Sequence, residues 1–237
     1  DPTFVDIDGD GDLDVFVGLG SYSYPGDSDV GDTLFSRNIG TAQNPIYEPS
    51  VINPFGLNDV GEFASPTFVD IDNDRDLDAF IGNELGDTIF LENIGTIANP
   101  VFSGSRTNPF GLSSVGFNAT PTFVDIDGDN DLDAFIKNFF FKNTGTANNP
   151  TFAAPQTNAF GLSGFRHAFI DIDEDGDLDA FINATYFLLN TGTVNNPVFS
   201  QGSFDSYGLP SQFYRSSIDT LTFADIDGDG DLDAYVT

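Results

Sequence analysis

Short stretches of alternating apolar and polar residues recur along the whole chain, and they predict β-strands. In one copy, residues 67–71 (TFVDI) and 77–82 (LDAFIG) are rich in β-branched and aromatic side chains, which strands favour. Residues 88–93 (TIFLEN) and 100–104 (PVFSG) have the same character. Asn-x-Gly-Thr and Asn-Pro segments separate the strands as turn signals. No stretch shows helical spacing over ten residues, so the pattern predicts an all-β protein.

The strand pattern belongs to one repeated unit, whose copies start near residues 3, 67, 122, 168 and 222. The first aspartates of successive copies are 64, 55, 46 and 54 residues apart. Each full unit holds four short strands. This number of strands and the length of the repeat are typical of a β-propeller blade. We therefore expect a single domain over residues 1–237, a β-propeller with four full four-stranded blades and a half blade.

The core of this propeller is predicted from its phenylalanines. The chain contains 26 Phe, and hydrophobic residues make up 39% of it. Four Phe residues occupy the same position in successive units, and we expect them to form the core between blades: Phe16, Phe80, Phe135 and Phe181.

The fifth copy ends after its second predicted strand, at residues 234–237 (AYVT). A closed propeller leaves no long unpaired strand edge. The half blade therefore indicates a segment of a longer chain, or completion by a neighbouring molecule, and the sequence leaves both open. Self-assembly through the incomplete blade is one interaction that we expect.

Acidic residues dominate the charge and limit what the propeller can bind. The chain has 38 Asp and Glu against 7 Lys and Arg, for a net charge of −31. Five aspartates in each of five motifs, together with Glu174, account for 26 of the 38 acids. This charge disfavours nucleic acid and anionic membrane surfaces as partners. No apolar run reaches the ~18–20 residues of a membrane span, and the absence of Cys excludes disulfides and thiolate sites.

The five motifs share the spacing D-x-D-x-D-x-D-x-D, as in residues 6–14 (DIDGDGDLD). Carboxylates at positions 1, 3, 5 and 9 can converge on one ion if the loop curls around it, and position 7 can offer its backbone carbonyl. Hard oxygen donors in this number suit Ca²⁺. Zn²⁺ prefers His or Cys, and Mg²⁺ keeps more of its water. The motifs therefore predict up to five Ca²⁺ sites, whose cations make the crowded charges tolerable.

An EF-hand does not fit these motifs. Its loop needs Glu at position 12 and a helix on each side. The chain has Val17 and Ile81 at this position in the first two copies, and both lie in predicted strands.

A strand–Asp loop–strand unit repeated every 46 to 64 residues resembles the FG-GAP/VCBS-type repeats of bacterial surface proteins. It is also similar to the calcium-binding blades of the integrin α-subunit propeller. The likeness covers essentially the whole chain. It implies that the loop joins the first and second strands of each blade. It also implies side-chain ligands at positions 1, 3, 5 and 9 and a carbonyl ligand at position 7. The implied metal ligands are Asp6, Asp8, Asp10, Asp12 and Asp14; Asp70, Asp72, Asp74, Asp76 and Asp78; Asp125, Asp127, Asp129, Asp131 and Asp133; Asp171, Asp173, Asp175, Asp177 and Asp179; and Asp225, Asp227, Asp229, Asp231 and Asp233.

Position 6 of the motif departs from the resemblance in one copy. The repeats favour Gly there, where the backbone tends to be left-handed, and Gly11, Gly176 and Gly230 comply. Asn130 is tolerated in this conformation. Arg75 costs about 1–2 kcal/mol there and brings a cation near the metal. We therefore expect the loop that begins at Asp70 to be the weakest site.

No catalytic constellation is evident in the sequence. His167 is the single histidine and occupies the slot of Pro66 and Pro121, so we expect an ordinary residue at a strand end. Thiol and Ser–His chemistry have almost no residues to use. We therefore expect a non-enzymatic, calcium-stabilised module for adhesion or assembly, with a protein or glycan ligand at its surface. Weak calcium modules work where the ion is millimolar, which favours an extracellular or cell-surface location.

Two alternatives remain open at the level of sequence. The first is a carbohydrate-binding, lectin-like propeller, with Tyr22 and Tyr24 of the longest loop, residues 21–30, as candidate contacts. The second, less favoured, is a calcium-dependent polysaccharide-degrading enzyme. Such an enzyme needs a base and a cluster of cations, whereas Lys137, Lys142 and five Arg are spread along the chain.

Overall fold

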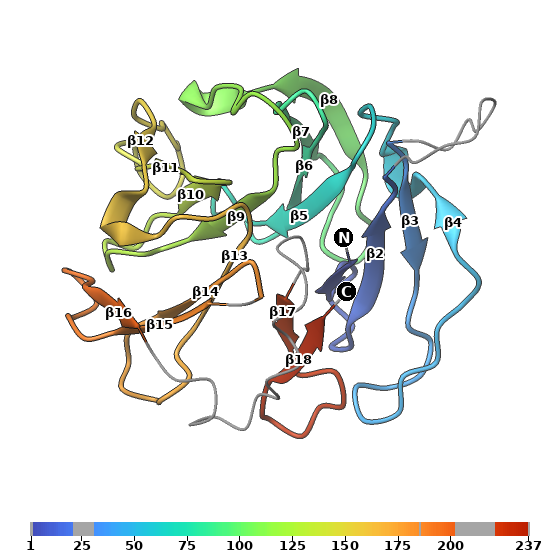
Figure 1. Ribbon diagram of the computed structural model, residues 1–237. Coiled ribbons are helices and arrows are strands. Elements are labelled where there is room, and N and C mark those ends of the chain that lie inside the picture. The colour runs from blue at the N-terminus through green and yellow to red at the C-terminus, as the bar shows by residue number, and fades with distance from the viewer. Residues whose placement is uncertain (1, 21–30, 185, 202–220, 237) are drawn as a thin grey trace.

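The computed structural model describes residues 2–20, 31–184, 186–201 and 221–236, and the fold is an all-β propeller (Figure 1). Four antiparallel sheets of four strands form four blades, and two further strands form a fifth sheet. The first two blades consist of β1 (Pro2–Val5), β2 (Asp14–Gly18), β3 (Thr33–Ser36), β4 (Val51–Ile52), β5 (Ser65–Val69), β6 (Asp78–Gly82), β7 (Thr88–Asn93) and β8 (Phe102–Thr107). The next two consist of β9 (Pro121–Val124), β10 (Asp133–Ile136), β11 (Phe139–Phe141), β12 (Gln156–Thr157), β13 (His167–Ile170), β14 (Asp179–Ile182), β15 (Tyr186–Asn190) and β16 (Phe199–Gln201). The fifth sheet consists of β17 (Leu221–Ala224) and β18 (Asp233–Val236). The predicted fold class is confirmed.

Consecutive strands pair within each blade, so every Asp motif lies in the connection between the first and second strands. In the first blade, Val5 pairs with Asp14, which brings the two ends of the motif together. The other four sheets have the same register, with the pairs Val69 and Asp78, Val124 and Asp133, Ile170 and Asp179, and Ala224 and Asp233. The predicted place of the loop within the blade is confirmed.

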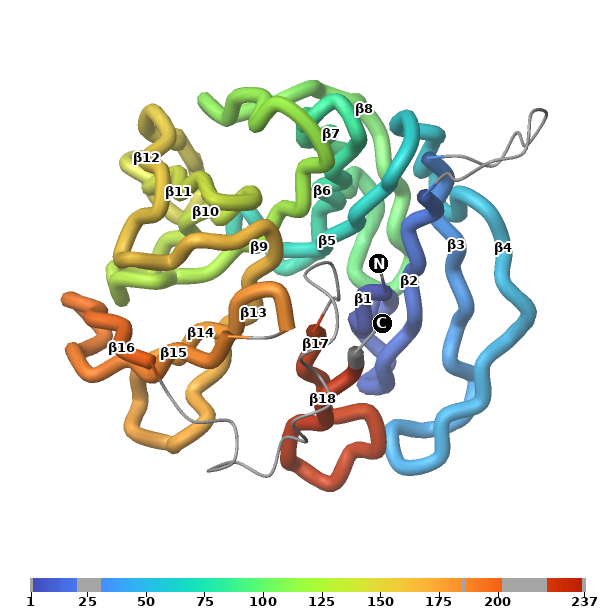
Figure 2. The backbone as a smooth tube through the Cα atoms, in the orientation of Figure 1, coloured from blue at the N-terminus to red at the C-terminus, as the bar shows by residue number. Residues whose placement is uncertain are grey.

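The first strands of the five sheets surround the centre of the molecule, and each contacts the next (Figures 1 and 2). The Thr3 hydroxyl donates a hydrogen bond of 2.7 Å to the carbonyl of Pro66 in the second blade. Equivalent bonds of 2.8, 3.2 and 3.5 Å run from Thr67 to Pro121, from Thr122 to His167 and from Thr222 to Pro2. The last of these joins β17 to β1, so the two-stranded sheet closes the ring.

The core lies between adjacent blades, as the repeated phenylalanines predict. The Phe16 ring packs on Phe68 of the next blade with ring centroids 4.2 Å apart. Phe80 with Phe123, Phe135 with Phe169 and Phe181 with Phe223 repeat this contact at 4.4, 4.9 and 5.1 Å. Tyr235 of β18 takes the same place against Phe4 at 5.4 Å. The interface that closes the ring is therefore built like the others.

The repeated Phe-Gly-Leu segments form short 3₁₀ turns beside the third strand: η1 (Pro54–Gly56), η2 (Pro109–Gly111) and η3 (Ala159–Gly161). Phe55 lies in the left-handed region with φ of 59°, and its ring packs edge-on against Phe35 at 5.0 Å. A side chain at Gly56 would meet the Phe102 carbonyl at 2.5 Å. The glycine is therefore required for this close approach.

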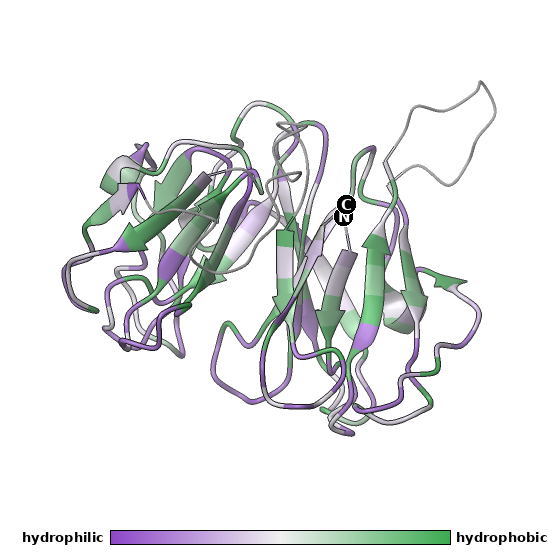
Figure 3. Cartoon of the chain, turned by 60° about the horizontal axis from the view of Figure 1, so that its bottom comes forward, coloured by the Kyte–Doolittle hydropathy of each residue, from purple (hydrophilic) through white to green (hydrophobic). Residues whose placement is uncertain are grey.

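Apolar residues line the strands, and hydrophilic ones lie mainly in the loops at the strand ends (Figure 3). Among the residues that the structure describes, no helix is long and apolar enough to span a membrane.

Candidate metal loops

The five Asp motifs form five loops with one hydrogen-bond plan, and we number them loop 1 (6–14), loop 2 (70–78), loop 3 (125–133), loop 4 (171–179) and loop 5 (225–233). In loop 1, the two carboxylate oxygens of Asp6 accept hydrogen bonds from the amides of Asp10 and Gly11 at 3.1 and 3.0 Å. The amide of Asp12 donates to Asp10 at 3.2 Å. All five loops repeat these bonds. The position-1 carboxylate therefore curls each loop inward.

This curling brings three carboxylates to one point. In each loop, one oxygen from each of positions 1, 3 and 5 lies within 4.8 Å of the others. The triads are Asp6, Asp8 and Asp10; Asp70, Asp72 and Asp74; Asp125, Asp127 and Asp129; Asp171, Asp173 and Asp175; and Asp225, Asp227 and Asp229. The predicted convergence of these residues is observed in every loop.

The position-9 aspartate is held apart from solvent in the four complete blades. Asp14 is 1% exposed, and its Oδ1 accepts the amide of Asn38 at 2.7 Å. Asp78, Asp133 and Asp179 accept the amides of Asn93, Asn143 and Asn190, each at 2.7 Å. Burial raises the pKa to about 6 for Asp14 and Asp179, and to about 7 for Asp78 and Asp133. Burial disfavours the charged form of such a carboxyl, and a cation beside it would favour that form.

Several buried carboxylate oxygens have no hydrogen-bond partner within the protein, and they test whether a metal fits. Asp8 is 7% exposed, and its Oδ1 has no partner. The same holds for Oδ2 of Asp14 and Asp133, and for Oδ1 of Asp12, Asp72, Asp76, Asp127, Asp131 and Asp177. Buried polar atoms without partners are costly, and an ion beside them removes that cost. The donors are all oxygens, so the set fits Ca²⁺.

The backbone carbonyls of the position-7 aspartates are expected to be metal ligands, and this role stays a prediction. Two of their side chains are buried: Asp12 and Asp177 are each 8% exposed, whereas Asp231 of loop 5 is exposed. Burial raises the pKa of both carboxyls, with Asp10 and Asp175 as the nearest added charges. The sequence alone did not indicate this burial.

The loop backbone is left-handed at position 6, as predicted. Gly11, Gly176 and Gly230 have φ of 94°, 96° and 97°, while Asn130 has 67° and Arg75 has 84°. Position 4 is left-handed too, which the sequence analysis missed: φ is 61° at Asn73 and 59° at Glu174. Gly9, Gly128 and Gly228 at the same position were a signal that could have shown it. The lower affinity of loop 2 stays a prediction.

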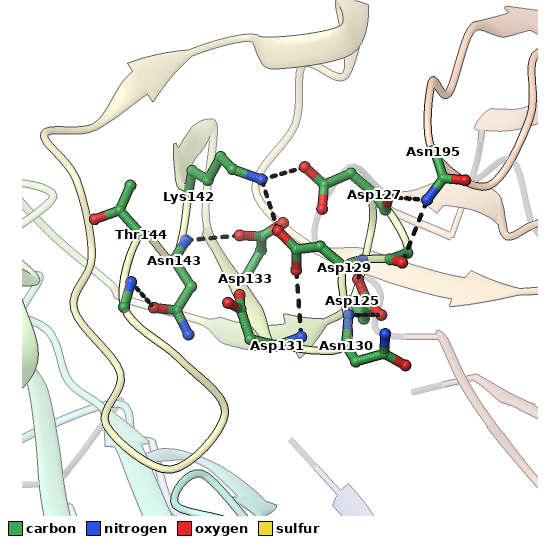
Figure 4. Close-up of polar contacts among 12 residues, drawn as sticks. Asp125, Asp127, Asp129, Asn130, Asp131, Asp133, Lys142, Asn143, Thr144 and Asn195 are labelled. Atoms are coloured by element: carbon green, nitrogen blue, oxygen red, sulfur yellow. Dashed lines mark hydrogen bonds and ion pairs between the residues drawn. The ribbon is translucent and has the colours of Figure 1, made fainter.

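Loops 2, 3 and 5 each accept a hydrogen bond from the next blade around the ring. The outer turns, Gly-Thr-x-x-Asn segments at residues 40–44, 95–99, 145–149 and 192–196, follow the third strands. Asn148 Nδ2 donates to the Asp72 carbonyl of loop 2 at 3.1 Å, and Asn195 Nδ2 donates to the Asp127 carbonyl of loop 3 at 2.9 Å (Figure 4). Gln43 donates to the Gly228 carbonyl of loop 5 at 3.2 Å. These three Asp loops therefore take part in the contacts between blades.

The remaining sequence candidates lie away from the loops or outside the described residues. His167 is 8% exposed, its Nε2 has no hydrogen-bond partner, and its ring lies 5.3 Å from that of Phe135. Burial lowers its pKa to about 4. It is thus a packed strand-end residue, as expected. Tyr22 and Tyr24 lie in residues 21–30, outside the described residues.

No protein-family model and no curated protein matches the chain. Among solved structures, it is similar to an Agrocybe aegerita lectin studied for specific recognition of non-reducing terminal N-acetylglucosamine. The identity is 17% and the TM-score 0.49, over 99% of this chain and 59% of that chain. It is also similar to the Tc holotoxin pore of Photorhabdus luminescens, with 15% identity and a TM-score of 0.37, over 99% of this chain and 13% of that chain. The chain thus spans less than two thirds of either neighbour, and the likeness concerns the backbone alone.

Proposed function

We propose that the chain is a calcium-stabilised, non-enzymatic β-propeller module of the FG-GAP/VCBS type, which works in adhesion or assembly outside the cell. The observation that carries this proposal is the set of partnerless, buried carboxylate oxygens beside the converging triads of loops 1 to 4. Ca²⁺ takes six to eight oxygen ligands at about 2.3–2.6 Å, and each loop offers four carboxylates and a carbonyl within nine residues.

The role of the ion is structural in this proposal. When bound, it neutralises the triad and the position-9 carboxylate together. Position 9 is hydrogen-bonded to the end of the third strand, and the loop is contacted by the next blade's outer turn. The chain's own residues thus transmit the closure of one loop to two blades.

Thermal unfolding with and without calcium tests this function. A ligand that binds the folded state alone adds about 2.7 kcal/mol per site at 100-fold excess over its Kd. In a domain of this size, 1 kcal/mol shifts the Tm by about 2–4 °C. We expect EGTA to lower the Tm by more than about 10 °C, and millimolar Mg²⁺ at equal ionic strength to restore little of it. An unchanged Tm in EGTA would defeat the proposal.

A glycan-binding role is the second candidate, favoured by an aromatic surface at the end of the propeller opposite the loops. Phe117 and Phe165 are 58% and 48% exposed. They flank the ammonium group of Lys137, at 3.2 and 4.8 Å from their ring centroids. A pocket of about 90 Å³ nearby is lined by Asn118 and Thr120, among others. Exposed rings beside polar groups can stack on sugars.

Binding to a glycan array separates the two candidate surfaces. We expect Phe117→Ala and Phe165→Ala to abolish binding if the aromatic surface is used. Loss of binding with Tyr22→Ala or Tyr24→Ala instead would favour the 21–30 segment as the binding surface. If the chain binds no glycan at all, the function is binding to a protein partner or self-assembly through the fifth sheet.

A further inference from the structure

One position of the repeat contacts the Asp loop of its own blade in two blades, and it holds a different residue in every complete blade. It directly precedes the asparagine whose backbone amide donates a hydrogen bond to the position-9 aspartate. The four residues at this position are Arg37, Glu92, Lys142 and Leu189. Two of them are cations, in a chain with few basic residues.

In loop 3, the cation lies between two carboxylates of the triad. Lys142 Nζ contacts Asp127 Oδ2 and lies 3.2 Å from Asp129 Oδ2 (Figure 4). These carboxylates converge with that of Asp125. The lysine side chain is 34% exposed, so much of its stem is covered. The ammonium group thus offsets the repulsion that closing the loop creates.

Loop 1 shows the same arrangement with a different cation. Arg37 Nη2 contacts Asp8 Oδ2, and the Asp8 side chain is 6% exposed. The arginine directly follows β3, and the lysine directly follows β11. Two blades thus place a positive side chain at the same point of the loop.

We propose that Arg37 and Lys142 are tethered counter-cations that hold loops 1 and 3 closed without metal and lower the affinity of these loops for Ca²⁺. Both effects have one physical origin, because a fixed positive charge stabilises the metal-free triad and repels a divalent ion. The first effect does not need metal, whereas the second rests on the proposed function.

Loops 2 and 4 lack this arrangement among the residues described. Glu92 adds a negative charge near Asp72 and pairs with Arg106 at 3.5 Å. Leu189 brings no charge and packs against a buried cluster that includes Phe181 and Phe187. In this proposal, the carboxylates of these two loops have no tethered cation at this position, so a bound ion would have to offset their repulsion.

Amide exchange of the whole chain in EGTA, followed residue by residue by NMR, tests the first effect. The reporters are the loop amides bonded to carboxylates: Asp129, Asn130 and Asp131 in loop 3, and Asp175, Gly176 and Asp177 in loop 4. A unit charge at about 4 Å in water changes an equilibrium about fivefold. We expect exchange in loop 3 to be at least about fivefold slower than in loop 4.

Exchanging the two side chains supplies matched variants. We expect Lys142→Leu to speed exchange in loop 3 by about fivefold in EGTA, and Leu189→Lys to slow it in loop 4. Lys142→Arg keeps the charge and should keep the protection, which separates charge from packing. In a calcium titration followed by the same amides, we expect Lys142→Leu to raise the affinity of loop 3 for Ca²⁺. We expect Leu189→Lys to lower the affinity of loop 4.

The outcomes for this inference and for the proposed function are distinguishable. If no loop binds calcium, the proposed function fails, yet the exchange in EGTA still decides whether the lysine closes loop 3. If calcium binds and exchange in EGTA is the same in Lys142→Leu and the parent chain, the inference is overturned alone. Loss of protection in Lys142→Arg as well would also overturn it, because packing would then explain the effect.

Discussion

The third and fourth blades share one backbone plan, yet they differ where side chains face the loop, the ring and the core. Their loops share the hydrogen bonds from backbone amides to the carboxylates at positions 1 and 5, and their first and second strands pair in the same register. The equivalent positions that differ between them include Pro121 and His167, Thr122 and Ala168, and Lys142 and Leu189. The comparison teaches that the repeated aspartates, phenylalanines and turns fix the blade, while single side chains adjust each copy.

The largest effect that we expect concerns the buried phenylalanine that both blades place at the interface with the next blade. Phe135 and Phe181 are 2% and 1% exposed and fill equivalent interfaces. Phe135→Ala and Phe181→Ala should each cost about 3–5 kcal/mol of unfolding free energy, because truncation leaves a cavity. Urea unfolding measures both.

Leu85→Ala is the matched control, since Leu85 is 63% exposed and the change should stay within about 0.5 kcal/mol. A cost below about 1 kcal/mol at Phe181 alone would show that the interface with the fifth sheet is not packed like the others.

The next effect concerns His167, which distinguishes the fourth blade. Its pKa in the folded protein, about 4, lies below its ordinary 6.5, so the unfolded chain binds a proton more readily. Its contribution to stability is complete above pH 6.5 and falls as the pH is lowered toward 4. One pKa unit corresponds to about 1.4 kcal/mol, so the loss is about 3 kcal/mol.

His167→Pro restores the residue of the third blade and should remove this part of the pH dependence. Urea unfolding of both proteins between pH 4 and 8 measures the difference, in which the shared titration of the aspartates cancels. Parallel curves for the two proteins would contradict the assignment.

The smallest effect concerns the ring of threonine hydroxyls. Thr122 donates to the His167 carbonyl, whereas Ala168 has no hydroxyl to donate to the fifth sheet. Ala168→Thr should add one hydrogen bond and stabilise the protein by about 0.5–1.5 kcal/mol, and Thr122→Ala should cost a similar amount. Differential scanning calorimetry detects both shifts, and a destabilised Ala168→Thr would mean that the fourth and fifth inner strands do not repeat the common spacing.

The features predictable from sequence are those encoded within a few residues or repeated in register. The loops were predictable because five aspartates lie within nine positions between two apolar strands. The interface phenylalanines were predictable because they recur at one place in every unit. The left-handed Phe55, Phe110 and Phe160 were not, because φ of a bulky residue is set by the contacts of its ring.

The contacts that adjust each loop could not be predicted in the same way. Lys142 reaches Asp127 across 15 residues, and Asn195 reaches the Asp127 carbonyl across 68. Both contacts depend on the register of the third strand and on how neighbouring blades are placed. The sequence shows that a lysine precedes an asparagine, but it does not show that both meet the same loop.

The contact of each outer turn with the preceding loop has a consequence for the order in which the molecule is built. During synthesis, loops 2 and 3 emerge before the turns that contact them, and each must wait for about one further blade. Loop 5 reverses this order, because its neighbour Gln43 belongs to the first blade. The outer turn of the first blade, although made early, thus remains without this contact until the fifth sheet is made, and the ring cannot close before then.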